Sequence, residues 1–154
     1  MATKIHPAPI SDHNEEDEPV FPDYILYFDG GSRGNPGPGG AGYALYKNDV
    51  EISSGSRALG RCTNNYAEYT ALIIGLEDAK ERNIHDLIIR GDSLLVLKQC
   101  EGEWKIKSDQ LRPLYNQAKK LLKHFETVEL EHVKRAFNKR ADQLANEGMD
   151  QNTD

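Results

Sequence analysis

The sequence contains few cysteines and no long apolar run. Its 154 residues include two cysteines, too few for a disulfide framework, and no cluster of cysteine and histidine has zinc-ligand spacing. No apolar run approaches the roughly 18 residues that a membrane helix needs, and the N-terminus lacks the basic and apolar segments of a secretory signal. With 38% hydrophobic and 29% charged residues, we expect one globular domain in the cytoplasm, without a membrane partner.

The formal net charge of -6 argues at first against a nucleic-acid partner, because phosphate backbones attract cationic side chains. The acids, however, concentrate at the two ends of the chain. Residues 1–23 hold six acids and one base, and residues 149–154 hold two acids and no base, which leaves 18 bases and 17 acids for residues 24–148. We predict a disordered acidic leader over 1–23, a near-neutral folded domain over 24–148 and a C-terminal tail over 149–154. A leader that binds a partner or mimics nucleic acid is the alternative.

Hydrophobic periodicity predicts the element order β-β-β-α-β-α-α-β-α, and therefore an α/β fold in which helices cover a five-stranded mixed sheet. A glycine-rich turn over 30–40 follows the first strand, the polar pair at 48–49 suits a hairpin, and Asn64 or Asn65 can cap the first helix. The expected strands are 24–29, 41–47, 51–59, 86–92 and 126–133, and the expected helices are 65–82, 93–99, 111–124 and 139–149.

Three acids occupy unusual positions. Asp29 and Asp92 each end an apolar strand, and Glu68 lies early in a helix among apolar neighbours. Ligand sites gather beyond the carboxyl ends of parallel strands, and clustered carboxylates need a cation to offset their charge. Oxygen ligands of this kind favour Mg²⁺ or Mn²⁺. Taken singly, each acid is more often a cap or turn residue, but the combination points to a metal site.

The combination resembles type 1 ribonuclease H over residues 24–148. The matching motifs occur in the family's order: Asp-Gly-Gly-Ser at 29–32 with Gly-Asn-Pro-Gly-Pro-Gly-Gly at 34–40, Thr-Asn-Asn at 63–65 with Ala-Glu at 67–68, Gly-Asp-Ser at 91–93, and Asn138 with Ala-Asp at 141–142 and Leu-Ala at 144–145. The resemblance implies an RNase H-like fold and four catalytic, metal-binding carboxylates: Asp29, Glu68, Asp92 and Asp142. Asp142 rests on the resemblance alone, since an acid in the first turn of a helix is usually explained by the helix dipole.

The same resemblance implies a reaction. Family members hydrolyse the RNA strand of an RNA–DNA hybrid with two Mg²⁺ ions per active site, for which Mn²⁺ can substitute, and leave 5′-phosphate and 3′-hydroxyl ends. No organic cofactor is expected, and we expect a monomer. Because metal generates the nucleophile, the lack of a Ser-His-Asp or Cys-His arrangement is no obstacle.

Substrate contacts follow from the matched motifs. By resemblance Arg61 and Thr63 grip a DNA phosphate, a task suited to a guanidinium and a hydroxyl. Asn64 and Asn65 would contact the minor groove, although helix capping competes for them, and Trp104 either stacks on the hybrid or packs against the protein. The expected substrate-binding residues are Gly30, Ser32, Asn35, Arg61, Thr63, Asn64, Asn65, Ser93, Trp104 and Asn138.

Two departures from the family's best-studied members bear on activity. The stretch 101–109 is short and has only Lys105 and Lys107 where those relatives carry a basic insertion, and residues 134–137 lack their loop histidine. We expect weaker binding and lower turnover, with His132 as an ordinary strand residue. A non-catalytic hybrid-binding module and a domain of a reverse transcriptase are the alternatives, although the leader and the end at Asp154 favour an intact small protein.

Overall fold

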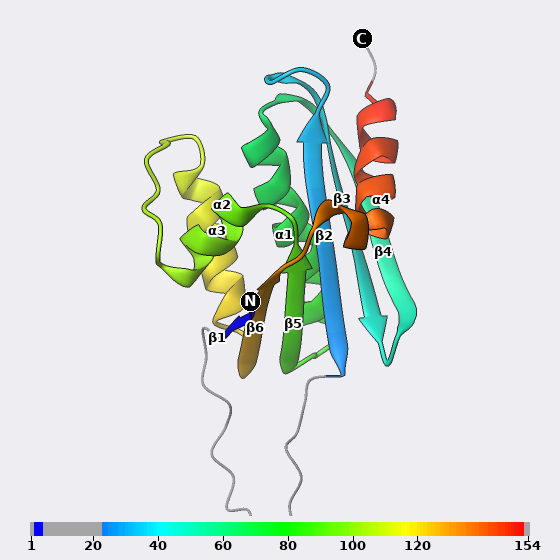
Figure 1. The fold of residues 1–154 in the computed structure, drawn as a ribbon, viewed down its shortest axis with the longest axis vertical. Coiled ribbons are helices and arrows are strands. Elements are labelled where there is room, and N and C mark those ends of the chain that lie inside the picture. Colours follow the sequence, from blue (N-terminus) through cyan, green and yellow to red (C-terminus); the bar gives the residue numbers. More distant parts are fainter. Residues whose placement is uncertain (1, 5–22, 153–154) are drawn as a thin grey trace, which may run out of the picture.

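The computed structural model describes residues 2–4 and 23–152, which fold around one mixed sheet with strand order β1-β6-β5-β2-β3-β4 (Figure 1). Strands β2, β3 and β4 form an antiparallel meander, while β5 and β6 run parallel to β2. The short β1 pairs antiparallel with β6 at the sheet edge. The strands are β1 Ala2–Lys4, β2 Tyr24–Ser32, β3 Gly37–Lys47, β4 Val50–Cys62, β5 Asp86–Gly91 and β6 Thr127–His132.

Helices cover the two faces of the sheet unequally. They are α1 Asn64–Glu81, α2 Leu94–Glu101, α3 Arg112–Leu122 and α4 Lys139–Asp150, and the 3₁₀ turn η1 at Arg135–Phe137 precedes α4. Helix α1 packs on β2 and β3 from one side, and α3 packs against α1. Helix α4 packs on β2, β3 and β4 from the other side and leaves β5 and β6 uncovered there (Figure 1). None of the helices in the described ranges has the length and apolar character of a membrane span.

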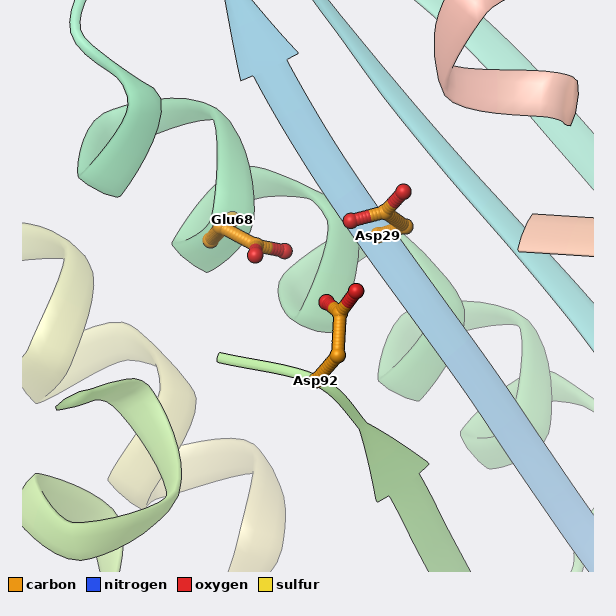
Figure 2. Close-up of side chains that lie close together, drawn as sticks. All are labelled: Asp29, Glu68 and Asp92. Atoms are coloured by element: carbon orange, nitrogen blue, oxygen red, sulfur yellow. The ribbon is translucent and has the colours of Figure 1, made fainter. Parts of the chain in front are cut away.

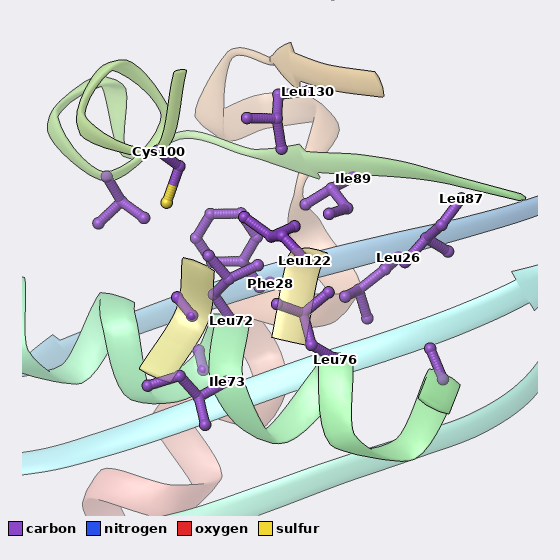
Figure 3. Packing of buried hydrophobic residues seen from close by; sticks show 14 of the residues in the cluster. Leu26, Phe28, Leu72, Ile73, Leu76, Leu87, Ile89, Cys100, Leu122 and Leu130 are labelled. Carbon is purple, nitrogen blue, oxygen red and sulfur yellow. The ribbon is translucent and has the colours of Figure 1, made fainter. Parts of the chain in front are cut away.

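The main core lies between the sheet and the α1 and α3 helices (Figure 3). Leu26 and Phe28 of β2 meet Leu72 and Leu76 of α1, and all four are fully buried. Along β5 the burial alternates, because only one face of that strand is covered. The core therefore fixes the position of α1 on β2, the two elements that carry the first candidate site residues.

The predicted five-stranded mixed sheet and its element order are confirmed, and β1 adds a sixth strand within the residues assigned to the leader. The rest of the leader prediction concerns residues 5–22, which lie outside the described residues. The hairpin at Asn48 and Asp49 is also confirmed: both adopt positive φ, 48° and 66°, as a two-residue turn requires.

Two local predictions were wrong, and the end of α4 differs from its prediction by one residue. The glycine-rich stretch 30–40 is mostly strand, because β2 continues to Ser32 and β3 begins at Gly37, so that the β2–β3 turn is only residues 33–36. The α1 N-cap is Thr63, whose hydroxyl accepts a hydrogen bond from the Tyr66 amide at 3.2 Å. At the other end of the domain, α4 extends to Asp150, inside the predicted tail.

Candidate active site

Three carboxylates from distant parts of the chain converge at one end of the sheet (Figure 2). Asp29, Glu68 and Asp92 each offer an oxygen, and these atoms lie within 4.8 Å of one another. Asp29 is in β2 and Asp92 directly follows β5, and the two strands are parallel neighbours with Phe28 opposite Gly91. The register therefore places Asp29 and Asp92 side by side, as the positions of these two acids at strand ends predict.

Glu68 reaches the other two acids because α1 lies unusually close to β2. A Cβ atom on Gly30 would lie 2.3 Å from the Ala67 carbonyl group, so that only glycine permits this approach. The Gly30 backbone amide donates a hydrogen bond of 2.8 Å to Glu68 Oε1. The glycine that follows Asp29 thus both admits the helix and orients the glutamate beside that aspartate.

The cluster is buried and strongly anionic. Asp29 is 7% exposed and Glu68 is 9% exposed. Burial, followed by the negative charges of Asp92 and Asp142, raises the pKa of Asp29 to about 8. Burial also raises the pKa of Glu68 well above its ordinary value, and the charges of Asp29 and Asp92 add to this.

No lysine or arginine within residues 23–152 forms an ion pair with Asp29, Glu68 or Asp92. A set of oxygen donors without a neutralising side chain fits a hard divalent cation. The positive charge of such a cation would offset the repulsion among the three carboxylates. The residues present therefore suit Mg²⁺ or Mn²⁺ better than a softer metal.

Asp142 lies next to this cluster rather than within its 4.8 Å set. It occupies the first turn of α4, and its hydrogen bond and its charge both contribute to the raised pKa of Asp29. Arg135 of η1 has Nη2 3.6 Å from Asp142 Oδ1. Nothing in the sequence marks Arg135 as a neighbour of Asp142 except its place in the stretch 134–137, just before α4.

Hydrogen bonds tie the end of β2 and the β2–β3 turn to the start of α1. Asn64 Oδ1 accepts hydrogen bonds from the Ser32 amide at 2.9 Å and from the Ser32 hydroxyl at 3.1 Å. Asn35 Oδ1 accepts from the Asn64 amide at 3.1 Å. Both side-chain oxygens are therefore engaged, while neither Nδ2 group has an acceptor in the described part of the protein. The network of Ser32, Asn35 and Asn64 presents amide donors to the solvent next to the carboxylates.

The other predicted substrate-binding residues differ from one another in exposure and in hydrogen bonding. Ser93 caps α2 by accepting from the Val96 amide at 3.3 Å. Arg61 and Asn65 are exposed, and Trp104 is 43% exposed in the segment between α2 and α3. Of the ten expected residues, Gly30 donates a hydrogen bond to the carboxylate of Glu68, while Ser32, Asn35 and Asn64 are hydrogen-bonded to one another.

Asn138 does not face the surface. It is 1% exposed, and its amide donates a 2.9 Å hydrogen bond to the carbonyl oxygen of Phe28, directly before Asp29. In this structure Asn138 positions the strand that carries Asp29 and offers no exposed group to a ligand. His132 ends β6, as expected of a strand residue, with Nε2 3.3 Å from the Asp92 carbonyl oxygen.

Comparison with known proteins places this geometry in a family. The family model described as "Reverse transcriptase-like" matches residues 27–148. Ribonuclease HI of Halobacterium salinarum is 48% identical over 125 residues, which cover 80% of this chain and 63% of the relative. A crystal structure of RNase H1 from the same archaeon matches with a TM-score of 0.80 at 45% identity, covering 84% of this chain and 98% of that one.

Two further solved structures have the same fold. The N-terminal RNase H domain of Rv2228c from Mycobacterium tuberculosis matches with a TM-score of 0.81 at 42% identity, over 84% of this chain and 94% of that one. LC11-RNase H1, solved in complex with an RNA/DNA hybrid, matches with a TM-score of 0.78 at 34% identity, over 83% and 97%. This chain spans 63% of the curated Halobacterium relative and 35% of the bifunctional Rv2228c protein. From the family model, the identities and the shared fold, the chain belongs to the type 1 ribonuclease H family.

Proposed function

We propose that this protein is an endoribonuclease that hydrolyses the RNA strand of RNA–DNA hybrids. The observation that carries the proposal is the convergence of Asp29, Glu68 and Asp92 within 4.8 Å, without a neutralising side chain. The hybrid bound to the related LC11 enzyme supports the substrate class. A module that only binds hybrid would gain nothing from concentrating negative charge where a phosphate must lie, and this disfavours the non-catalytic alternative.

Asp29, Glu68 and Asp92 would hold the metal, with Asp142 completing the set from α4. When bound, two Mg²⁺ ions, or Mn²⁺ in their place, would supply the missing positive charge, activate a water molecule for in-line attack and stabilise the leaving 3′ oxygen. The partly buried Gly30–Glu68 hydrogen bond fixes one carboxylate before any ligand arrives, and Asn138 fixes the strand that bears another. The products would carry 5′-phosphate and 3′-hydroxyl ends.

The orientation of the asparagine side chains supports binding in a minor groove. Because the oxygens of Asn35 and Asn64 accept protein hydrogen bonds, each side chain offers only N–H donors outward. The minor-groove edges of base pairs present acceptors at similar positions whatever the sequence. Donors held in this way would recognise the groove without sequence preference, which suits an enzyme that must act on any hybrid.

Strand discrimination requires contacts on both strands. Arg61 and Thr63 would hold a phosphate of the DNA strand, with Thr63 fixed by its role as the α1 cap. Arg61 is exposed and close in sequence to that cap, so it can reach a backbone that Asn64 contacts in the groove. Because the segment 101–109 carries only two lysines, we propose that hybrid binding is modest and strongly weakened by salt.

The test is a cleavage assay on duplexes labelled on one strand at a time, with Mg²⁺ or Mn²⁺ added. Wild-type protein should cut the RNA strand of an RNA–DNA hybrid and leave the DNA strand, RNA–RNA duplex and single-stranded RNA intact. Asp92→Asn should abolish cutting, whereas Asp109→Asn, whose side chain is 96% exposed, should not. Cleavage that ignores strand identity or survives Asp92→Asn would overturn the proposal.

A further inference from the structure

The C-terminal end of α4 and Asn152, which follows it, contact the β2–β3 turn and the end of β4. These two regions carry the predicted substrate-binding residues Asn35 and Arg61. Arg33, in the β2–β3 turn, forms an ion pair with Asp150 and a longer hydrogen bond of 3.4 Å with Asn146 Oδ1. Asn152 Oδ1 accepts from the Gly60 amide at 2.8 Å, and Asn152 Nδ2 donates to the Gly39 carbonyl at 2.7 Å. We call Asn146, Asp150 and Asn152 the C-terminal clamp.

The clamp spans a hollow in the surface. A pocket of about 440 Å³ is lined by residues of the β2–β3 turn, the start of β3, the end of β4 and the C-terminal end of α4. On its opposite side the turn is held by the hydrogen bond between Asn35 and the Asn64 amide. Arg33 links the turn to α4 through its ion pair with Asp150 and its hydrogen bond with Asn146. The cavity is lined by Arg33, Pro38, Gly60, Arg61, Met149, Asp150 and Asn152.

We propose that Asp150 and Asn152 are positioning residues for hybrid binding. Asp150 holds the turn that bears Asn35, and Asn152 holds Gly60, the neighbour of Arg61. This inference rests on the proposed function, since it assigns the two contacts to the hybrid. None of the three clamp residues belongs to the carboxylate cluster, and so the clamp acts on binding by keeping the contacts preorganised, and not on the chemical step.

The variant Asp150→Asn separates this idea from a simple effect of charge. Removing an acid near a polyanionic substrate, and freeing Arg33, would by electrostatics alone lower the KM for the hybrid. Loss of positioning has the opposite sign. We expect Asp150→Asn to raise KM about five-fold with kcat within two-fold of wild type, Asp150→Glu to restore most of the loss, and Asn152→Ala to raise KM similarly without changing charge.

A matched control lies at the other end of the same helix. Arg140 in the first turn of α4 forms an ion pair with Glu51 of β4 through two contacts of 2.8 and 3.3 Å. Glu51→Gln breaks an ion pair of α4 far from the β2–β3 turn. We expect its KM to stay within two-fold of wild type, even where its melting temperature falls as much as that of Asp150→Asn.

A second measurement needs no substrate. Hydrogen exchange of a peptide covering residues 32–38 should be faster in Asp150→Asn than in wild type and unchanged in Glu51→Gln. An unchanged exchange rate, or a KM that falls or stays the same in Asp150→Asn, overturns the inference. Failure of wild-type protein to cleave hybrid would overturn the proposed function instead, while faster exchange would still show that Asp150 holds the turn.

Discussion

Asp29, Glu68 and Asp92 are like charges held close together with little exposure to solvent, whereas Ser32, Asn35 and Asn64 are neutral and joined by hydrogen bonds. Helix α1 contributes to both groups, since Asn64 and Glu68 are one turn apart on it. The first group is incomplete without an outside positive charge. The second is satisfied within the protein and only presents donors. Substitutions in the first group should therefore alter the chemical step and stability, and those in the second should alter affinity.

Among the substitutions that compare these two groups, the largest effect should come from Glu68→Gln. Glutamine keeps an oxygen that can accept from the Gly30 amide, so that the change removes charge while leaving the packing in place. We expect kcat for hybrid cleavage to fall roughly 1000-fold, because a metal ligand is lost. Glu77→Gln, at an exposed position of the same helix, is the control and should retain wild-type kcat. A Glu68→Gln enzyme with more than a tenth of wild-type kcat would remove the distinction between the two groups.

Stability should respond to Asp29→Asn in the opposite direction from activity. The folded-state pKa of Asp29, about 8, exceeds the ordinary 3.8, so the metal-free folded protein binds more protons than the unfolded chain between these values. Its free energy of unfolding should therefore fall as pH rises from about 4 to 8. Asp29→Asn should reduce that fall and stabilise the metal-free protein at pH 8 by roughly 1–3 kcal/mol, measured by urea unfolding. Equal pH dependence in the two proteins would contradict the electrostatic description of the cluster.

Asn64→Ala should affect affinity more than turnover. It removes the acceptor for two Ser32 hydrogen bonds and an outward donor, and we expect KM for the hybrid to rise about ten-fold, or ~1.4 kcal/mol. Asn116→Ala, on the exposed side of α3, supplies the comparison. Steady-state kinetics that show a loss confined to kcat would mean that Asn64, like the three carboxylates, acts on the chemical step.

The smallest effect is expected from Arg61→Ala. A single exposed phosphate contact should be worth about a three-fold change in KM, and its loss should reduce the salt dependence of binding by about one unit of slope. Fluorescence anisotropy of labelled hybrid at several salt concentrations measures both. An unchanged slope would mean that Arg61 does not contact a phosphate.

Asp29 and Asp92 were predictable as site candidates because acids at the ends of apolar strands are visible in a single sequence. The position of Glu68 depends on how closely α1 packs on Gly30, and periodicity does not report such a distance. Asp142 followed from family resemblance alone. The assignment of Asn138 to the substrate surface conflicts with its burial, since a residue before a helix can face inward or outward with the same local pattern.

The contacts of the C-terminal residues could not be predicted from the sequence. Their acidic composition predicted a tail, yet Asp150 pairs with Arg33 across 117 residues and Asn152 contacts Gly60 across 92. Long-range partners of polar side chains leave no local signature. In contrast, the hairpin at 48–49 was predictable because a two-residue turn selects its own residue types.

Magnesium titration of the substrate-free protein tests the central claim most directly. With a pKa of about 8, Asp29 is mostly protonated at pH 7, so Mg²⁺ binding to the carboxylate cluster must release protons. Calorimetry in buffers of different ionisation enthalpy should show proton release near pH 7 that diminishes by pH 9, and Glu68→Gln should weaken the binding at least ten-fold. Mg²⁺ binding that releases no protons, or that is as tight in Glu68→Gln as in wild type, would contradict the account.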